Sequence, residues 1–261
     1  MICALLLGRE GSIAFPGKNL HPLLGRPLVA YPLMAARQAK SVDRTYVSTD
    51  SPRIKEIAIR YGARVIDRPA HLATKTALGE HAFVHGYEVI RRQLSEENKT
   101  LDLLALLFAN AATVLPEQID EAVRVLQTQP QIDSCVTVSR YNMWSPLRAR
   151  KINAKGLLDP FVPFETFGDP ESLNCDRDSQ GDVWFADMGL SVVRPRCLDN
   201  LDDGLLPQKW MGKNIHPLKQ WGGLDVDYDW QLPQVEHWLR AHGFTEADAS
   251  EPNKSTVRSI S

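Results

Sequence analysis

ICALLLG, at Ile2–Gly8, is an apolar run without alternation, and it leads into REGSIAFPGKN, at Arg9–Asn19, a segment rich in small and charged residues. An unbroken apolar run of this length is typical of a strand that is buried on both faces of a parallel sheet. In open α/β sheets, ligands bind beyond the carboxyl ends of such strands. The start of the chain therefore predicts a parallel sheet with a binding loop directly after its first strand.

Strand-like and helix-like stretches alternate from there to Ser139, with short connections between them. This alternation predicts an α/β fold in which an open, mostly parallel sheet carries helices on both faces. The predicted strands are Arg44–Thr49, Ala63–Asp67, Leu101–Ala109 and Ser134–Ser139. The predicted helices are Pro27–Lys40, Pro52–Tyr61, Gly79–Leu94 and Pro116–Gln127.

The pattern changes in residues 141–182, which contain several prolines and glycines and no sustained helical period. We interpret them as a small β-rich lobe inserted into a single domain, residues 1–245. Residues 246–261 are polar and lack aromatic side chains, and they are predicted to be a disordered tail. The last predicted elements of the domain are a strand at Val183–Val193, a turn at Gly222–Asp229 and a helix ending near Ala241.

Composition excludes several classes of protein. The 261 residues are 43% hydrophobic and 24% charged, as in ordinary globular domains. A formal net charge of −2 gives no support to a nucleic-acid partner. No apolar run approaches the ~20 residues of a membrane span, and the apolar start is too short for a signal peptide. We therefore expect a cytoplasmic protein with neither nucleic acid nor a membrane as partner.

The loop after the first predicted strand is the first candidate binding site. Its small residues leave backbone N–H groups accessible to an anion, and Arg9 and Lys18 supply positive charge for a polyphosphate. The loop matches neither the Walker A pattern nor GxGxxG, which disfavours a P-loop NTPase and a nicotinamide enzyme. The alternative is an ordinary turn with two solvated cations.

Two carboxylates near the end of the chain form the second candidate site. Asp225 and Asp227 are two residues apart, so on an extended segment they point the same way. Such a pair can hold Mg²⁺, which prefers hard oxygen ligands and keeps waters that phosphate oxygens replace. The alternative is an acidic turn in which Asp229 caps the last helix. A basic phosphate loop in the same chain favours the metal site, because phosphoryl chemistry uses both parts.

Five segments of the chain follow a known family pattern in the same order. They are Leu5–Tyr31 (LLLGREGSIAFPGKNLHPLLGRPLVAY), Val47–Ala63, Asp67–Ala77, Pro116–Val123 and Gly222–Leu232 (GGLDVDYDWQL). They resemble the cytidylyltransferases that make CMP-activated acid sugars, the CMP-sialic acid synthetase family, and the resemblance reaches to about Leu239. It implies a Rossmann-like sheet of the nucleotide-diphospho-sugar transferase type, with the lobe used for homodimerisation.

The resemblance also implies the reaction and its residues. CMP passes from CTP to a 2-keto-3-deoxy acid sugar and pyrophosphate leaves, with Mg²⁺ held by Asp225 and Asp227 and with Arg9 and Lys18 offsetting phosphate charge. The nucleotide-binding residues implied are Gly8, Arg9, Gly11, Ser12, Lys18, Asn19 and Arg68.

Four further residues are predicted to bind the sugar. Asn110 and Asp187 are expected at strand ends that face the cleft. Arg148 and Arg150 lie in the predicted lobe. One of them, supplied by the neighbouring subunit, is expected to hold the carboxylate of the sugar. The alternative for these two arginines is the solvated face of a strand.

Departures from the family pattern leave other functions open. Ile13 replaces a usual lysine, Glu10 replaces a glycine, and Phe108–Ala112 replaces a Q-P-T-S-P stretch. The alternatives are a nucleotidyltransferase that uses another nucleotide or a sugar 1-phosphate, and a catalytically silent nucleotide-binding homologue. Retention of Lys18 and both aspartates favours an active enzyme.

Overall fold

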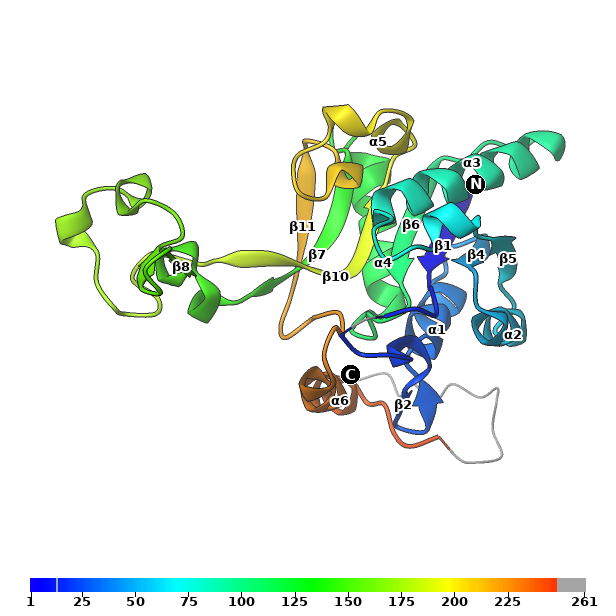
Figure 1. The fold of residues 1–261 in the computed structure, drawn as a ribbon. Helices are drawn as coiled ribbons and strands as arrows, with labels where there is room; N and C mark the ends of the chain where they lie inside the picture. Colours follow the sequence, from blue (N-terminus) through cyan, green and yellow to red (C-terminus); the bar gives the residue numbers. More distant parts are fainter. Residues whose placement is uncertain (13, 248–261) are drawn as a thin grey trace.

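A computed structural model describes residues 1–12 and 14–247, so Ile13 and most of the predicted tail lie outside the described residues. The core is a seven-stranded sheet (Figure 1). Strand β10 runs antiparallel to both of its neighbours, and all other neighbouring strands are parallel. The predicted mostly parallel sheet is thus confirmed. Across the sheet the order is β11 (Ile215–Gln220), β7 (Ser134–Arg140), β10 (Trp184–Val193), β6 (Leu103–Phe108), β1 (Ile2–Leu7), β4 (Arg44–Thr49) and β5 (Arg64–Asp67).

Helices cover both faces of this sheet, and the side chains of β1 show how. Ala4 and Leu6 belong to one buried cluster, whereas Leu5 and Leu7 belong to another on the opposite face. The alternation follows from strand geometry, since successive side chains point to opposite faces. On the first face lie α1 (Ala30–Gln38), α2 (Pro52–Arg60) and α4 (Pro116–Thr128), and on the second lie α3 (Gly79–Glu96) and the short α5 (Arg196–Asp199).

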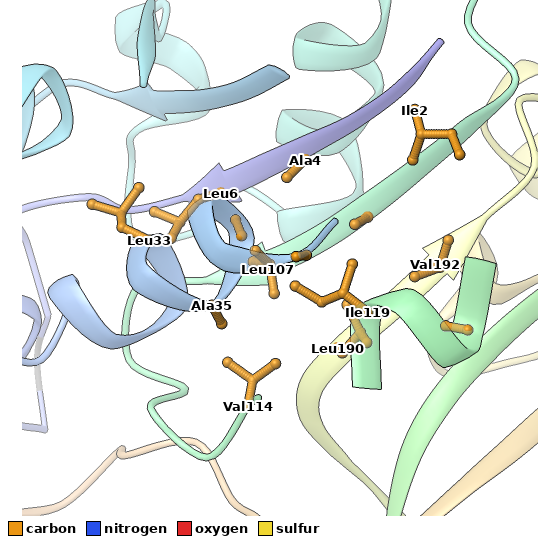
Figure 2. Close-up of a cluster of buried hydrophobic side chains, with 14 of the residues drawn as sticks. Ile2, Ala4, Leu6, Leu33, Ala35, Leu107, Val114, Ile119, Leu190 and Val192 are labelled. Atoms are coloured by element: carbon orange, nitrogen blue, oxygen red, sulfur yellow. The ribbon is translucent and has the colours of Figure 1, made fainter. Parts of the chain in front are cut away.

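The first cluster joins the sheet to α1 and α4. Figure 2 shows Leu6 and Leu107 of the sheet near Leu33 of α1 and Ile119 of α4. All four side chains are almost fully buried. On the other face, α3 lies so close to β1 that a Cβ on Gly86 would come within 2.6 Å of Leu5 Cδ2. The sheet is therefore held from both sides, which fixes the positions at which its strands end.

A third, smaller cluster fixes the segment that carries the two predicted metal ligands. Val226 is fully buried against α6 (Leu232–Ala241) and the short hairpin of β2 (Pro22–Leu23) and β3 (Arg26–Pro27). Its N–H also donates to the carbonyl of Asn110, 2.9 Å away. Because Val226 points into this cluster, the residues on either side of it are directed the other way.

The lobe differs from the prediction. Only β8 (Arg150–Ile152) and β9 (Leu158–Pro160) pair within residues 141–182, and much of the rest forms short 3₁₀ helices, so "β-rich" is wrong for this segment. Three of these helices begin at or directly after Pro146, Pro163 and Pro170. Proline has no N–H to donate to a ladder, which explains why longer strands do not form. The lobe extends away from the sheet beyond β7 and β10 (Figure 1).

Strand β11 was not predicted. Pro217 lies in its middle, and proline is confined to edge strands because it cannot donate to a ladder. β11 is indeed the edge strand of the sheet, paired only with β7. Helix α1 starts at Ala30 rather than Pro27, because Pro27 pairs with Pro22 in the hairpin. None of the described helices is long and apolar enough to cross a membrane.

Candidate active site

A cavity of about 370 Å³ opens beyond the carboxyl ends of β1, β5 and β6. This is the edge of the sheet at which the sequence places ligand binding. Its polar lining comes from the loop after β1, the loop after β5, the end of β6 and the segment before α6. Of the predicted site residues, it is lined by Arg9, Gly11, Ser12, Lys18, Asn19, Arg68, Asn110 and Asp227.

The loop after β1 is held in shape by its own side chains. Asn19 donates from Nδ2 to the carbonyl of Arg9 at 2.8 Å, and Arg9 Nη1 donates to the carbonyl of Thr74 at 2.7 Å. Gly17 has φ 75°, a left-handed conformation that glycine adopts without strain, just before the turn of Lys18–Leu20. Asn19 Oδ1 is buried and accepts no hydrogen bond from the described residues. Asn19 also lines the cavity, so these contacts fix the loop at one of its walls.

Arg68 forms a second wall of the cavity. Its guanidinium donates from Nη2 to the carbonyl of Ser48 at 2.6 Å and from Nε to the Ser48 hydroxyl at 3.2 Å. Burial lowers the pKa of Arg68 to about 10, with a further lowering from the nearby Arg9 and an opposing effect of Asp50. The side chain stays charged at neutral pH. Arg9, Lys18 and Arg68 therefore bring three positive charges to one cavity.

The two aspartates lie together with Lys18 and Asn110. Lys18 Nζ is 2.6 Å from Asp227 Oδ1, and Asn110 Nδ2 donates to Asp225 Oδ2 at 3.1 Å. Burial raises the pKa of Asp225, the charge of Asp227 raises it further, and Lys18 opposes both. Asp225 does not itself line the cavity but lies behind Asn110 and Asp227. Within residues 1–12 and 14–247, no cluster of three or more His, Cys, Asp or Glu side chains forms a potential metal site.

Asp229 does not cap the last helix as the alternative interpretation required. Its carboxylate accepts a hydrogen bond from the N–H of Trp230, within a 3₁₀ turn that precedes α6. The residue before α6 is Gln231, which makes no capping bond with its side chain. The acidic segment is therefore not explained by helix capping.

Gly8 and Asp187 do not line this cavity. Gly8 packs against Ala109 and Ile54, where a Cβ would lie 3.0 Å from that of Ala109. Asp187 is only 4% exposed, and its carboxylate accepts hydrogen bonds from groups inside the fold. The prediction that Asp187 faces the cleft is wrong, because β10 bulges there and turns the side chain inward between β7 and β11.

Arg148 and Arg150 lie in the lobe and line a separate cavity of about 600 Å³. Arg148 donates to the carbonyl of Cys175, and Arg150 to that of Leu147, both at 2.7 Å. Within one chain the structure does not bring them to the first cavity. Their predicted contact with the sugar therefore depends on a second chain.

An apolar wall of the cavity was missed by sequence reasoning. Leu72 and Leu78, after β5, line it together with Phe108, whose ring packs edge-to-face on Phe83 with 5.1 Å between the ring centroids. The sequence contained a signal for this wall, because Phe108 lies near the carboxyl end of the most apolar run, where ligands are expected to bind. Glu10, whose charge opposed a polyphosphate site, is exposed and outside the lining.

Comparisons with known proteins identify the family of the chain. Residues 3–143, more than half of the chain, match the family model described as cytidylyltransferase. The chain is 33% identical over 178 residues to the CMP-N,N'-diacetyllegionaminic acid synthase of Legionella pneumophila, covering 68% of this chain and 72% of that protein. It is 27% identical over 253 residues to N-acylneuraminate cytidylyltransferase A of Danio rerio, covering 96% of this chain but only 53% of the zebrafish protein.

The fold has solved counterparts as well. The structure of CMP:2-keto-3-deoxy-manno-octonic acid synthetase complexed with CTP superposes with a TM-score of 0.61 at 15% identity, covering 92% of this chain and 98% of that one. At this identity the likeness concerns the fold alone. The family match and the relative from Legionella decide the assignment: the chain is a nucleotidyltransferase that belongs to the cytidylyltransferase family, among relatives that are CMP-sugar synthetases.

Proposed function

We propose that the protein transfers CMP from CTP to a 2-keto-3-deoxy acid sugar of the sialic or legionaminic type and releases pyrophosphate. The observation that carries this proposal is one cavity lined by Arg9, Lys18, Arg68 and the carboxylate of Asp227, with the carboxylate of Asp225 adjoining it through Asn110. Phosphoryl chemistry needs both, because cations offset the phosphate charge and carboxylates hold a divalent metal. The substrates named for the relatives supply the acid-sugar part of the proposal.

CTP would lie along the loop after β1. Arg9, Lys18 and Arg68 would contact its phosphates, and the backbone N–H groups of Gly11 and Ser12, which line the same cavity, would bind the same oxygens. Asn19 lines the same cavity and would contact the nucleotide as well. Leu72, Leu78 and Phe108 offer the flat face of the base an apolar surface.

Asp225 and Asp227 fit Mg²⁺ by the chemistry of their oxygens and by their common direction on either side of buried Val226. A bound Mg²⁺ would stabilise charge on the phosphate oxygens in the transition state. Lys18, which bonds Asp227, would have to share this carboxylate with the cation. Asn110 holds Asp225 in place through its amide.

In the reaction, the anomeric hydroxyl oxygen of the sugar forms a bond to the α-phosphorus of CTP while the bond to the β-phosphate oxygen breaks. Pyrophosphate leaves with the electron pair of that bond, and the hydroxyl proton passes to water. Arg9, Lys18 and Arg68 bind the leaving group and offset its growing charge. Asn110, at the end of β6, is placed to orient the attacking sugar.

The lobe is proposed to complete the site in a homodimer. Ile152, Leu158 and Phe161 of this lobe are 62–75% exposed, which is unusual for a group of large apolar side chains. Burial against a second chain would cover them and bring Arg148 or Arg150 to the partner's sugar site. Because CTP is a cytoplasmic metabolite, we place the reaction in the cytoplasm.

Pyrophosphate release tests this function. The protein is incubated with each of the four nucleoside triphosphates, Mg²⁺ and a panel of sialic, legionaminic and octulosonic acids and sugar 1-phosphates. We expect release with CTP and one or more of the keto acids. Release only with a sugar 1-phosphate or another nucleotide would contradict the proposal, and nucleotide binding without any release would indicate a silent homologue.

A further inference from the structure

Asp187 is a buried carboxylate for which the proposed reaction has no direct use. It is 4% exposed, and it accepts hydrogen bonds from the hydroxyls of Thr137 and Ser139, the amide of Gln220 and the N–H of Gly189, at 2.6 to 3.1 Å. All four donors are neutral, and burial raises the pKa of Asp187. A buried charge without a cationic partner costs free energy, so its retention here calls for an explanation.

The explanation lies in the segment that packs against this carboxylate. Gly223 sits against it so closely that a Cβ would come within 2.5 Å of both Asp187 Oδ2 and Gln220 Nε2. The N–H of Gly223 donates to the Ser139 hydroxyl at 2.9 Å, and that hydroxyl donates to Asp187 at 2.8 Å. Asp225, the first predicted metal ligand, follows Gly223 by two residues.

A carboxylate fixes the direction of these hydrogen bonds. It can only accept, so the Ser139 proton must point toward it and leave a lone pair of the Ser139 oxygen for the N–H of Gly223. Thr137 works in the same way, since it donates to Asp187 and accepts from the N–H of Leu190 at 2.9 Å. An asparagine at position 187 would replace one carboxylate oxygen with an NH₂ group, which would then face groups that themselves donate.

The next residue of the segment is fixed from the same network. Gln220, which donates to Asp187, also donates to the carbonyl of Thr113 at 3.2 Å. The Thr113 hydroxyl accepts from the N–H of Leu224 and donates to its carbonyl, at 3.0 and 3.1 Å. Gly223 and Leu224 are therefore both held, directly before Asp225.

We propose that Asp187 is a positioning residue that seats Gly223 through Ser139 and thereby places Asp225 and Asp227 to hold a divalent cation. This proposal rests on the proposed function, because it needs the cation at these two carboxylates. It gives Asp187 a role without contact to the sugar. A residue that orients metal ligands in this way affects metal affinity more than nucleotide affinity.

The test uses Mn²⁺ as the probe, titrated into the full chain saturated with CTP and followed by water-proton relaxation. Asp187→Asn is expected to weaken Mn²⁺ binding about tenfold, the usual loss for a residue that supports a metal ligand. CTP binding without metal should change less than twofold, because the loop after β1 is untouched. Ser139→Ala, which keeps the carboxylate but removes the relay to Gly223, should weaken Mn²⁺ binding in the same direction.

Ser134→Ala is the matched control, since Ser134 is equally buried on β7 but bonds the carbonyl of Met211 instead. It should leave Mn²⁺ binding unchanged. Folded Asp187→Asn and Ser139→Ala proteins with wild-type Mn²⁺ affinity would overturn the positioning role, and Ser139→Ala decides alone if Asp187→Asn does not fold. If Asp225→Asn also binds Mn²⁺ like the wild type, the metal site of the proposed function fails first.

Discussion

Asp225 and Asp227 have different surroundings although they are two residues apart. Asp225 is mostly buried behind Asn110, whereas Asp227 reaches the cavity and bonds Lys18. Asp229, two residues further, is exposed and bonds only the N–H of Trp230 among the described residues. Asp227 is therefore the residue to test, and Asp229 is a natural control at the same spacing.

Asp227→Asn should reduce kcat by at least about 100-fold, because a ligand of the cation contributes more than the residues that support ligands. The measurement is pyrophosphate release at saturating CTP and sugar, over a range of Mg²⁺ concentrations. Asp229→Asn should retain the wild-type rate. Equal rates for Asp227→Asn and the wild type would exclude Asp227 as a metal ligand.

Lys18 bonds the same carboxylate that the cation is proposed to use. Lys18→Met should raise the affinity for Mn²⁺ in the absence of nucleotide about fivefold, because an ion pair of this kind contributes about 1 kcal/mol. The same change should weaken CTP binding. Lys99→Met, which removes an amino group paired with Glu97 outside the cavity, is the control and should change neither. Unchanged Mn²⁺ affinity in Lys18→Met would show that the amino group does not compete.

At the scale of elements, α3 depends on its close approach to β1. Gly86→Ala should lower the free energy of unfolding by about 1–3 kcal/mol, because the new methyl group meets Leu5 in a filled core. Gly79→Ala, in the same helix, meets only Phe108 at 3.8 Å and should be neutral or slightly stabilising. Urea denaturation of both variants makes the comparison, and equal losses would mean that the contact with Leu5 adjusts without cost.

Most of the elements could be predicted because their patterns are local. Strand β4 and helix α2 were both predicted within one residue, the helix from the spacing of its apolar residues after Pro52. Strand β11 escaped because Pro217 interrupts it, and only its place at the edge of the sheet makes the proline acceptable. Only the β-rich character of the lobe was predicted wrongly, because 3₁₀ helices that begin at its prolines take the place of strands.

At the scale of the whole molecule, the lobe should control the association of chains. Phe161→Asp should convert the proposed dimer into a monomer and lower the rate of transfer, because it puts a charge on the apolar surface that is proposed to contact the partner. Sedimentation velocity measures the mass, and pyrophosphate release measures the rate. Ile59→Asp, on an equally exposed apolar residue of α2, is the control and should remain a dimer. A wild-type protein that sediments as a monomer would contradict the dimer.

The site itself could be predicted in part. Lys18 and Asp227 were assigned to one site although they are 209 residues apart, because parallel strands end at a common edge and the family pattern joins them. Asp187 was misplaced because a register shift between Ala186 and Ser191 turns it inward, and no sequence pattern marks such a bulge. Interactions that depend on a strand's register are visible only once the sheet is assembled.

The central claim is that the CMP group of CTP ends on an acid sugar. The direct measurement is a reaction with CTP labelled at the α-phosphorus and, in parallel, at the γ-phosphorus, with Mg²⁺ and a sialic or legionaminic acid. We predict that the α-label appears in a CMP–sugar conjugate while the γ-label appears in pyrophosphate, and that neither occurs with Asp227→Asn. An α-label that stays in CTP with every acid sugar, or that appears only in free CMP, would contradict the account.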